Sequence, residues 1–315
     1  MKHLTFFESA KKVDRAGRLA QVRIYLGKFF RIFIYEADWK VLPMAVIVSA
    51  LVAGVCVNVF VNMEATMIGS LAFACVCIWN GFFNSIQVVC RERKIIKREH
   101  RSGLHITSYI AAHMIYQAFI CLCQVLIQLI VYKLCGYKYP TQGIITGSFV
   151  LDFGITLFLV TYAADMLALL VSCIVSNTTD AMTVVPFLLI VQLIFSGVAF
   201  PLEGAAEKIS NFTISRWGIR TINTVANYNS MRSMTLYAAV NKLTIIPELK
   251  EIIEAIRKTD IWYKLGDAST MDARSVLYEF TPENVMHEWG ILFLMAMVFA
   301  VLGTLILERI DYDKR

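Results

Sequence analysis

The sequence predicts an all-α membrane protein with six transmembrane helices, an amphipathic connecting helix before the first and a large external segment before the sixth. Three observations predict this fold class. The 315-residue chain is 57% hydrophobic and only 17% charged, with a mean hydropathy of +0.61, a balance that soluble domains of this size seldom reach. Its apolar residues gather in long runs, and its Lys and Arg residues gather between alternate runs.

Each apolar run is long enough to cross a membrane. At a rise of ~1.5 Å per residue, such a run spans a hydrocarbon core ~30 Å thick. Because lipid offers no hydrogen-bond partners to the backbone, we expect all of these spans to be helices. The predicted spans are residues 41–60, 67–89, 106–132, 144–174, 181–202 and 289–307.

The N-terminal segment, residues 1–40, is basic and amphipathic. Within it, residues 18–35 place apolar side chains at helical spacing with Arg and Lys beside them. We expect this helix to lie among the headgroups of membrane lipids before the first span, and an ordinary surface helix is the alternative. The segment has no short apolar stretch with a small-residue cleavage site, so it does not resemble a signal peptide.

The distribution of Lys and Arg predicts the orientation. Nine lie in residues 1–40, six in 90–105 and three after Leu307, whereas loops 61–66 and 133–143 hold two between them. Basic residues are in excess in cytoplasmic loops, so both termini should be cytoplasmic. The predicted segments are a cytoplasmic N-terminal segment at 1–40, five spans with a cytoplasmic elbow at 90–105 within 41–202, an external segment at 203–288, and the last span with its cytoplasmic tail at 289–315.

Polar side chains form one stripe in the second span and another in the third. Amides do not face lipid cheaply, so both stripes should face protein or a cavity. Hydrogen bonding between helices and the lining of a pathway are the two interpretations that this leaves open. The stripes comprise Asn80, Asn84 and Gln87 in the second span, with Phe73 and Cys77 continuing the same face, and His113, Gln117, Cys121, Gln124 and Gln128 in the third.

Two acids, Asp152 and Asp165, lie in the fourth predicted span. That run would measure ~46 Å as a helix, longer than the hydrocarbon core, so we expect both acids near its ends. Anchoring of helix ends is the favoured interpretation, and a transport role is the alternative. Gly197 and Pro201 are expected to end the fifth span near the outer surface.

The sequence lacks the motifs of nucleotide hydrolysis and of common hydrolases. It contains no Gly-x-x-x-x-Gly-Lys-Ser/Thr loop, no His-Glu-x-x-His and no Gly-x-Ser-x-Gly. The eight cysteines lie in or beside the spans and are interpreted as small apolar residues rather than metal ligands. We therefore expect no enzyme activity, no metal and no cofactor in this chain, and nothing indicates a nucleic-acid partner.

The elbow carries the most specific motif, Glu92-Arg93-Lys-Ile-Ile-Lys-Arg98-Glu99-His100-Arg-Ser-Gly103. It resembles the run Glu-Arg-x-x-x-x-Arg-Glu-His-x-x-Gly that follows the second span in permeases of type-two ABC transporters, most closely those of the G subfamily. A second match comprises Leu169 to Asn177 and Ala181 to Pro186, which resemble the family's hinge between the fourth and fifth spans, and Phe195-Ser-Gly197, which resembles its Phe-Ser-Gly exit. Together the similarities cover about residues 18–310.

The resemblance implies a permease driven by a partner ATPase that binds ATP and Mg²⁺, with a second permease half completing a homo- or heterodimer in the plasma membrane. Export of an amphipathic compound, lipid or peptide by alternating access is the implied function. It further implies that the elbow contacts the ATPase and that the second and fifth spans line a cavity. The implied coupling residues are Glu92, Arg93, Arg98, Glu99, His100 and Gly103, and the implied pathway residues are Phe73, Asn80, Asn84, Phe187, Gln192 and Phe195.

Two departures from the family pattern affect these expectations. The ATPase domain that is usually fused upstream is not in this sequence, so it would be a separate chain or have been removed. The paired external cysteines of eukaryotic members are missing, which favours a bacterial version. A membrane sensor or assembly factor that acts through residues 203–288 is the alternative function.

Overall fold

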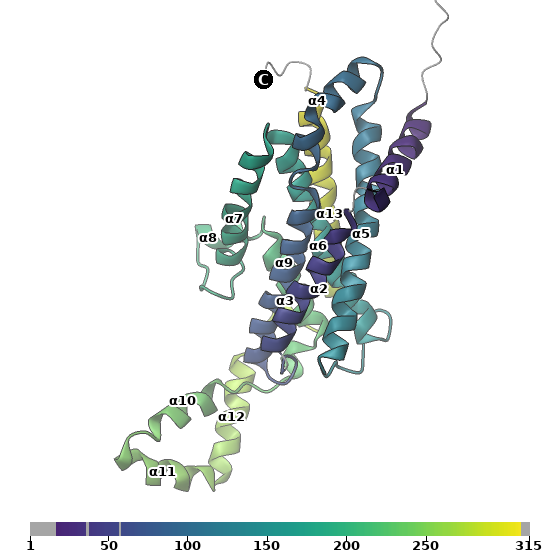
Figure 1. Ribbon diagram of the computed structural model, residues 1–315. Coiled ribbons are helices and arrows are strands. Elements are labelled where there is room, and N and C mark those ends of the chain that lie inside the picture. The colour runs from purple at the N-terminus through teal and green to yellow at the C-terminus, as the bar shows by residue number, and fades with distance from the viewer. Residues whose placement is uncertain (1–16, 36–37, 57, 310–315) are drawn as a thin grey trace, which may run out of the picture.

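The computed structural model describes residues 17–35, 38–56 and 58–309 (Figure 1). It is 79% helical, and the described residues contain no strand, as the sequence predicts. Parts of the predicted cytoplasmic termini, residues 1–16 and 310–315, lie outside the described residues. The helices are α1 Arg18–Tyr35, α2 Val41–Val55, α3 Met63–Ser85, α4 Val88–Arg101, α5 Ile106–Leu134, α6 Phe149–Ile174, α7 Thr178–Ile194, α8 Ala205–Ser210, α9 Ile214–Val225, α10 Thr235–Leu243, α11 Pro247–Arg257, α12 Asp260–Asp272 and α13 Pro282–Leu307.

Four helical stretches in the described residues are long and apolar enough to cross a membrane. They are α3 continued by α4, α5, α6 and α13. The predicted first and fifth spans become shorter apolar helices of 15 and 17 residues, α2 and α7. Helix α7 ends just before Gly197, whose φ of +79° suits glycine and confirms the predicted break.

Helices α3 and α6 form the centre of the bundle, with α13 on α6, and α1 and α2 on α5. The two central helices cross closely because α3 has a glycine at the crossing. A Cβ at Gly81 would lie 2.4 Å from the backbone oxygen of Thr161 and 2.8 Å from the nitrogen of Asp165. These neighbours are backbone atoms of a packed helix, so they cannot easily move aside.

We expect Gly81→Ala to destabilise the bundle by about 1–3 kcal/mol, because overpacking forces backbone shifts. Thermal unfolding of the purified protein in detergent measures the effect. Gly54→Ala in α2 is the matched control, since nothing lies within 4 Å of its added Cβ. Equal melting temperatures for both variants would contradict the close crossing.

The segment 203–288, predicted to be external as a whole, divides into two parts. Helix α9 packs against α3, α6 and α13, and ten of its residues are buried. Sequence reasoning missed this because α9 is too short for a span and mixes Ser, Thr and Asn with its apolar residues. Helices α10–α12, which we call the arm (residues 235–272), project away from the bundle (Figure 1).

The arm is tethered to the start of α3 by one carboxylate. The backbone nitrogens of Met234 and Thr235 donate to Oε1 of Glu64 at 2.9 and 3.0 Å, and the hydroxyls of Ser233 and Thr235 donate to the same oxygen. Glu64 thus supplies acceptors for the first N–H groups of α10, which a helix cannot pair internally.

The two acids of α6 have different surroundings. The helix begins at Phe149, so Asp152 lies in its first turn and accepts hydrogen bonds from the nitrogens of Ile144, Ile145 and Thr146. The predicted anchoring role is confirmed for Asp152. The predicted end position is wrong for Asp165, which is fully buried within the helix because α6 is shorter than the apolar run.

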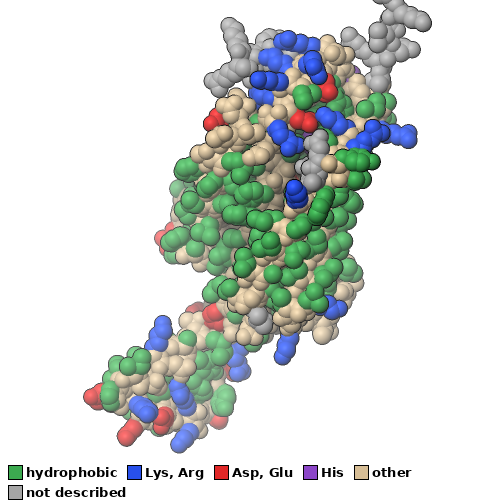
Figure 2. Space-filling model, viewed as in Figure 1, with side chains coloured by type: hydrophobic (Ala, Val, Ile, Leu, Met, Phe, Trp, Pro, Cys, Tyr) green, Lys and Arg blue, Asp and Glu red, His purple; other side chains and the backbone are tan. Residues whose placement is uncertain are grey.

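The charges are unevenly distributed over the surface. Lys and Arg side chains gather at the α4 end of the bundle, and the middle is largely hydrophobic (Figure 2). Helix α1, helix α4 and the end of α13 share this end, and the arm lies at the opposite one (Figure 1). The structure therefore places both terminal helices beside the basic elbow, as the charge pattern requires, while the compartment that each end faces remains a prediction.

Candidate coupling elbow and polar core

Helix α4 is fixed at its start to α6. The buried hydroxyl of Ser172 accepts hydrogen bonds from the backbone nitrogens of Val89 and Cys90, at 3.0 and 3.2 Å. These N–H groups belong to the first turn of α4 and have no partner within the helix. A side chain of α6 therefore caps α4.

Arg93 makes the second connection between the two helices. Its guanidinium donates to the backbone oxygens of Cys173 and Val175, at 2.9 and 3.2 Å. Carbonyls at the end of a helix are unpaired and carry partial negative charge, so a cation is favoured there. Arg93 thus ties the elbow to the end of α6.

Helix α1 holds the other side of the elbow through three polar residues that lie one turn apart, Lys28, Tyr25 and Gln21. Lys28 forms an ion pair with Glu92, 3.2 Å between Nζ and Oε2. The hydroxyl of Tyr25 donates to Oε2 of Glu99 at 2.6 Å. We call Lys28–Glu92 and Tyr25–Glu99 the latch.

One turn further along α1, Gln21 bonds the turn that follows α4. Its amide nitrogen donates to the carbonyl of Gly103 at 3.1 Å, and its amide oxygen accepts from the nitrogen of His105 at 2.9 Å. Gly103 has a φ of +110°, which explains the glycine in the motif. The elbow and α1 therefore form one connected unit.

The electrostatics of the latch favour the hydrogen bond from Tyr25. Burial raises the pKa of the Tyr25 hydroxyl, and the hydrogen bond to Glu99 and its negative charge raise it further. The phenol therefore stays protonated near neutral pH and remains a donor.

Two more residues of the motif complete the elbow. Nδ1 of His100 lies 3.0 Å from the carbonyl of Leu104, within hydrogen-bond distance. Arg98 is exposed, and no hydrogen bond or ion pair joins its side chain to any described residue. Because Glu92 and Glu99 have partners within the chain, these two acids do not by themselves require the contact with an ATPase that the resemblance implies for the elbow.

A basic groove runs between α4 and the turn from α6 to α7. Its volume is about 780 Å³, and it is open to the surface. Acidic side chains of another protein would complement such a groove. It is lined by Cys90, Arg91, Arg93, Lys94, Lys97 and residues 176–180.

The polar stripes of α3 and α5 meet in the bundle. Asn84 and Gln124 exchange two hydrogen bonds, each 2.9 Å long. Cys121 lies 3.4 Å from Oδ2 of the buried Asp165 and 3.7 Å from the amide nitrogen of Asn84. Hydrogen bonding between helices is thus the interpretation that the contacts favour for Asn84.

The other implied pathway residues are spread over different environments. Asn80 is buried, and its amide nitrogen has no hydrogen-bond partner among the described residues. Phe73 is buried in an aromatic cluster, 4.9 Å from the ring of Tyr132. In this single chain the pathway residues of α3 therefore face the protein interior.

The pathway residues of α7 are likewise not gathered. The side-chain oxygen of Gln192 accepts from the backbone nitrogen of Ser215 at 2.9 Å, which caps the start of α9. Phe187 is 66% exposed on α7, and Phe195 is half-buried. Of the implied set, only the exposed Phe187 offers a large apolar surface to a second chain.

A buried ion pair between α9 and α13 was missed by sequence reasoning. Nε of Arg220 lies 3.2 Å from Oε1 of Glu288, which is fully buried, and the guanidinium lies 4.7 Å from the ring centre of Trp217. The available signal was an acid directly before the last apolar run and an Arg within a segment predicted to be external.

Comparison with known proteins bears on this arrangement. Residues 27–222 match the family described as ABC-2 type transporter. The ABC transporter ATP-binding/permease protein Rv1747 of Mycobacterium tuberculosis is 28% identical over 144 residues, which is 45% of this chain and only 16% of that protein. The family match covers more than half of the chain and contains the elbow, the polar core and most of α9. The chain belongs to the ABC-2 type transporter family and is a membrane-spanning transporter permease.

Proposed function

We propose that this permease is an exporter of an amphipathic compound, lipid or peptide, similar to the G subfamily, and that it works by alternating access in a dimer. The observation that carries the proposal is the double attachment of α4, to α6 by Ser172 and Arg93 and to α1 by the latch. Because α4 is attached on both sides, a displacement of α4 must move α1 and α6 together with it.

The path of such a displacement follows the contacts. A force on α4 acts on α6 through Ser172 and Arg93, and α6 packs on α3 and α13. The hydrogen bonds around Asn84 and Asp165 lie where α3, α5 and α6 meet. Rocking of packed helices against one another is a common form of transition between two states.

The family implies an ATP-binding partner. We propose that this partner carries ATP and Mg²⁺, that it contacts the basic groove and the exposed Arg98, and that the chain itself has no enzymatic activity, metal or cofactor. A second permease half, homologous or identical, would cover the exposed apolar face of α7. Membrane lipids would surround the rest, and no nucleic-acid partner is proposed.

For the topology we propose six spans, with α2 and α7 included. Their lengths, ~22 and ~26 Å at 1.5 Å per residue, fall short of a ~30 Å core, but flanking residues and local thinning accommodate such a mismatch. Both termini would be cytoplasmic, the arm external, and the membrane the plasma membrane of a bacterium.

The topology predicts a labelling pattern for single cysteines in a cysteine-free background. A cysteine at Asp260, in the exposed first turn of α12, should react with a membrane-impermeant maleimide in intact cells. A cysteine at Lys94, exposed on α4, should react only after permeabilisation. The reverse pattern would overturn the orientation.

Transport is tested by reconstitution with the ATPase encoded next to this chain. The complex should co-purify and should hydrolyse ATP faster when a transported amphiphile is added. A neighbouring gene without an ATPase, or a chain that purifies with no ATP-hydrolysing subunit, would contradict the proposal.

The arm favours a second candidate function, that of a membrane sensor or assembly factor. It exposes large apolar side chains, with Ile245 82%, Ile252 55% and Met271 67% exposed. Exposed apolar patches often mark binding sites. Deletion of residues 235–272 separates the two functions, because an exporter would keep ATP-dependent transport whereas a sensor would lose its activity.

A further inference from the structure

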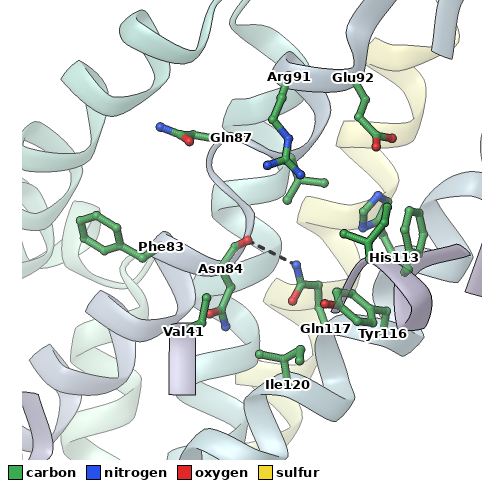
Figure 3. A pocket seen from close by; sticks show the side chains of 13 residues that line it. Val41, Phe83, Asn84, Gln87, Arg91, Glu92, His113, Tyr116, Gln117 and Ile120 are labelled. Atoms are coloured by element: carbon green, nitrogen blue, oxygen red, sulfur yellow. Dashed lines mark hydrogen bonds between the residues drawn. The ribbon is translucent and has the colours of Figure 1, made fainter. Parts of the chain in front are cut away.

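A cavity of about 160 Å³ lies at the α4 end of the bundle, between α1, the start of α2, the end of α3, α4 and α5 (Figure 3). At ~30 Å³ per water molecule, the cavity has room for about five waters. A phosphate group has five heavy atoms and is therefore of a suitable size. The cavity borders the coupling elbow at Glu92 and the polar core at Asn84, but the roles given to those two sites do not involve it.

Two buried polar side chains line the cavity without full use of their hydrogen-bonding atoms. His113 is 2% exposed, and neither ring nitrogen has a partner among the described residues. Gln117 is also 2% exposed, and its side-chain oxygen has no such partner. Buried polar groups are nearly always paired, so these atoms indicate a polar occupant.

The charge that faces the cavity is positive. Arg91 extends from α4 toward Asn84 and Gln117 (Figure 3), and no hydrogen bond or ion pair joins its side chain to any described residue. The acid beside it, Glu92, is neutralised by Lys28 at 3.2 Å. Among the described residues that line the cavity, one cation therefore has no compensating acid, and an anionic group would be bound best.

The remaining wall is apolar and opens toward the bundle surface. Figure 2 shows that the basic end borders the hydrophobic middle of the surface, the level at which lipid headgroups meet their chains. An occupant with an anionic head and an apolar tail would satisfy both parts of the wall. The apolar lining comprises Phe29, Ile32, Val41, Phe83, Val88, Tyr116 and Ile120.

We propose that this cavity binds the phosphate headgroup of an anionic phospholipid from the adjacent leaflet. The phosphate accepts hydrogen bonds from Arg91 and from a ring N–H of His113, and the free oxygen of Gln117 accepts one from a hydroxyl group of the headgroup. The first part of an acyl chain lies along Phe29 and Ile32. The proposal requires only that the chain spans a membrane, and it is independent of export, substrate and ATPase.

The test uses the full-length chain in vesicles of equal phosphatidylglycerol and phosphatidylcholine. A photoreactive benzoylphenylalanine replaces Phe83, which lies at the rim of the cavity and is 39% exposed. Mass spectrometry of the crosslinked lipids should show enrichment of phosphatidylglycerol over the vesicle composition. The same replacement at Phe293, 52% exposed on α13, is the matched control and should report the bulk ratio.

Variants connect the enrichment to the cavity. Arg91→Gln should reduce it by about fivefold, the usual contribution of one basic residue near a membrane surface. Lys94→Gln, a change of equal charge one turn along α4 and outside the cavity, should leave it unchanged. Equal losses for both variants would assign the enrichment to general surface charge and overturn the site.

Two further outcomes would overturn the proposal without any variant at Arg91. One is a bulk lipid ratio at Phe83. The other is loss of the enrichment on addition of millimolar inorganic phosphate, which would make the cavity a site for a soluble anion. Persistence of the enrichment in phosphate buffer supports a lipid headgroup held by its chain as well as by its charge.

Discussion

Glu92→Gln and Glu99→Gln are expected to uncouple ATP hydrolysis from transport while the permease still inserts normally. Each change removes the charged acceptor of one latch contact, to Lys28 or to Tyr25. A hydrogen bond to a charged group contributes about 1.5–3 kcal/mol when buried, and the partial exposure of both contacts places the effect near the lower limit. A change of ~1.4 kcal/mol shifts a two-state equilibrium about tenfold. Substrate-stimulated ATPase activity and transport in proteoliposomes are the measurements.

A charge swap shows whether the latch acts within the chain. Lys28→Glu combined with Glu92→Lys restores the ion pair in reverse, so coupling should return if Glu92 acts through α1. If Glu92 instead contacts the ATPase, the swap should remain as uncoupled as the single variant. Glu251→Gln, on the distant and exposed α11, controls for loss of one acid. Unchanged stimulation in both single variants would remove the coupling role of the latch.

The sequence predicts local elements best where periodicity and charge agree. Helix α1 has the predicted bounds, because its apolar residues repeat at helical spacing between residues 18 and 35 and this spacing is not continued on either side. The elbow is recognisable because six basic residues interrupt the apolar runs. The partners of Glu92 and Glu99 could not be predicted, since α1 precedes them by more than 60 residues and only the packing of α1 on α5 brings them together.

The contacts between buried side chains could be predicted less well from the sequence. A stripe of amides indicates that Asn84 avoids lipid, but not that it pairs with Gln124, because protein and cavity exclude lipid equally. The resemblance implied a pathway role for Gln192, yet this side chain caps α9, a helix that was not predicted although Ile214, Trp217 and Val225 stand at helical spacing. Helix α9 is short and rich in hydroxyl residues, so its burial depends on neighbours distant in sequence.

The ion pair between Arg220 and Glu288 should have the largest effect on stability. Glu288 is fully buried, and the side chain of Arg220 is 15% exposed. Removal of one member leaves a buried charge without a partner, which typically costs about 3–5 kcal/mol. We therefore expect Arg220→Met or Glu288→Leu to lower the melting temperature strongly and to loosen α9 from α13. Thermal unfolding and hydrogen exchange of residues 214–225 are the measurements.

The double variant Arg220→Met/Glu288→Leu should recover most of the loss. The two groups are 3.2 Å apart, yet the carboxylate oxygens lack hydrogen-bond geometry, so their attraction offsets little of the desolvation cost. Apolar side chains of similar volume would avoid that cost. The pair Arg216–Glu207, 3.6 Å apart with Glu207 57% exposed, is the matched control, and Glu207→Gln should change stability by less than about 1 kcal/mol. If the double variant were as unstable as the single ones, the ion pair would be a net stabilising contact, and α9 would depend on its charge rather than on its packing.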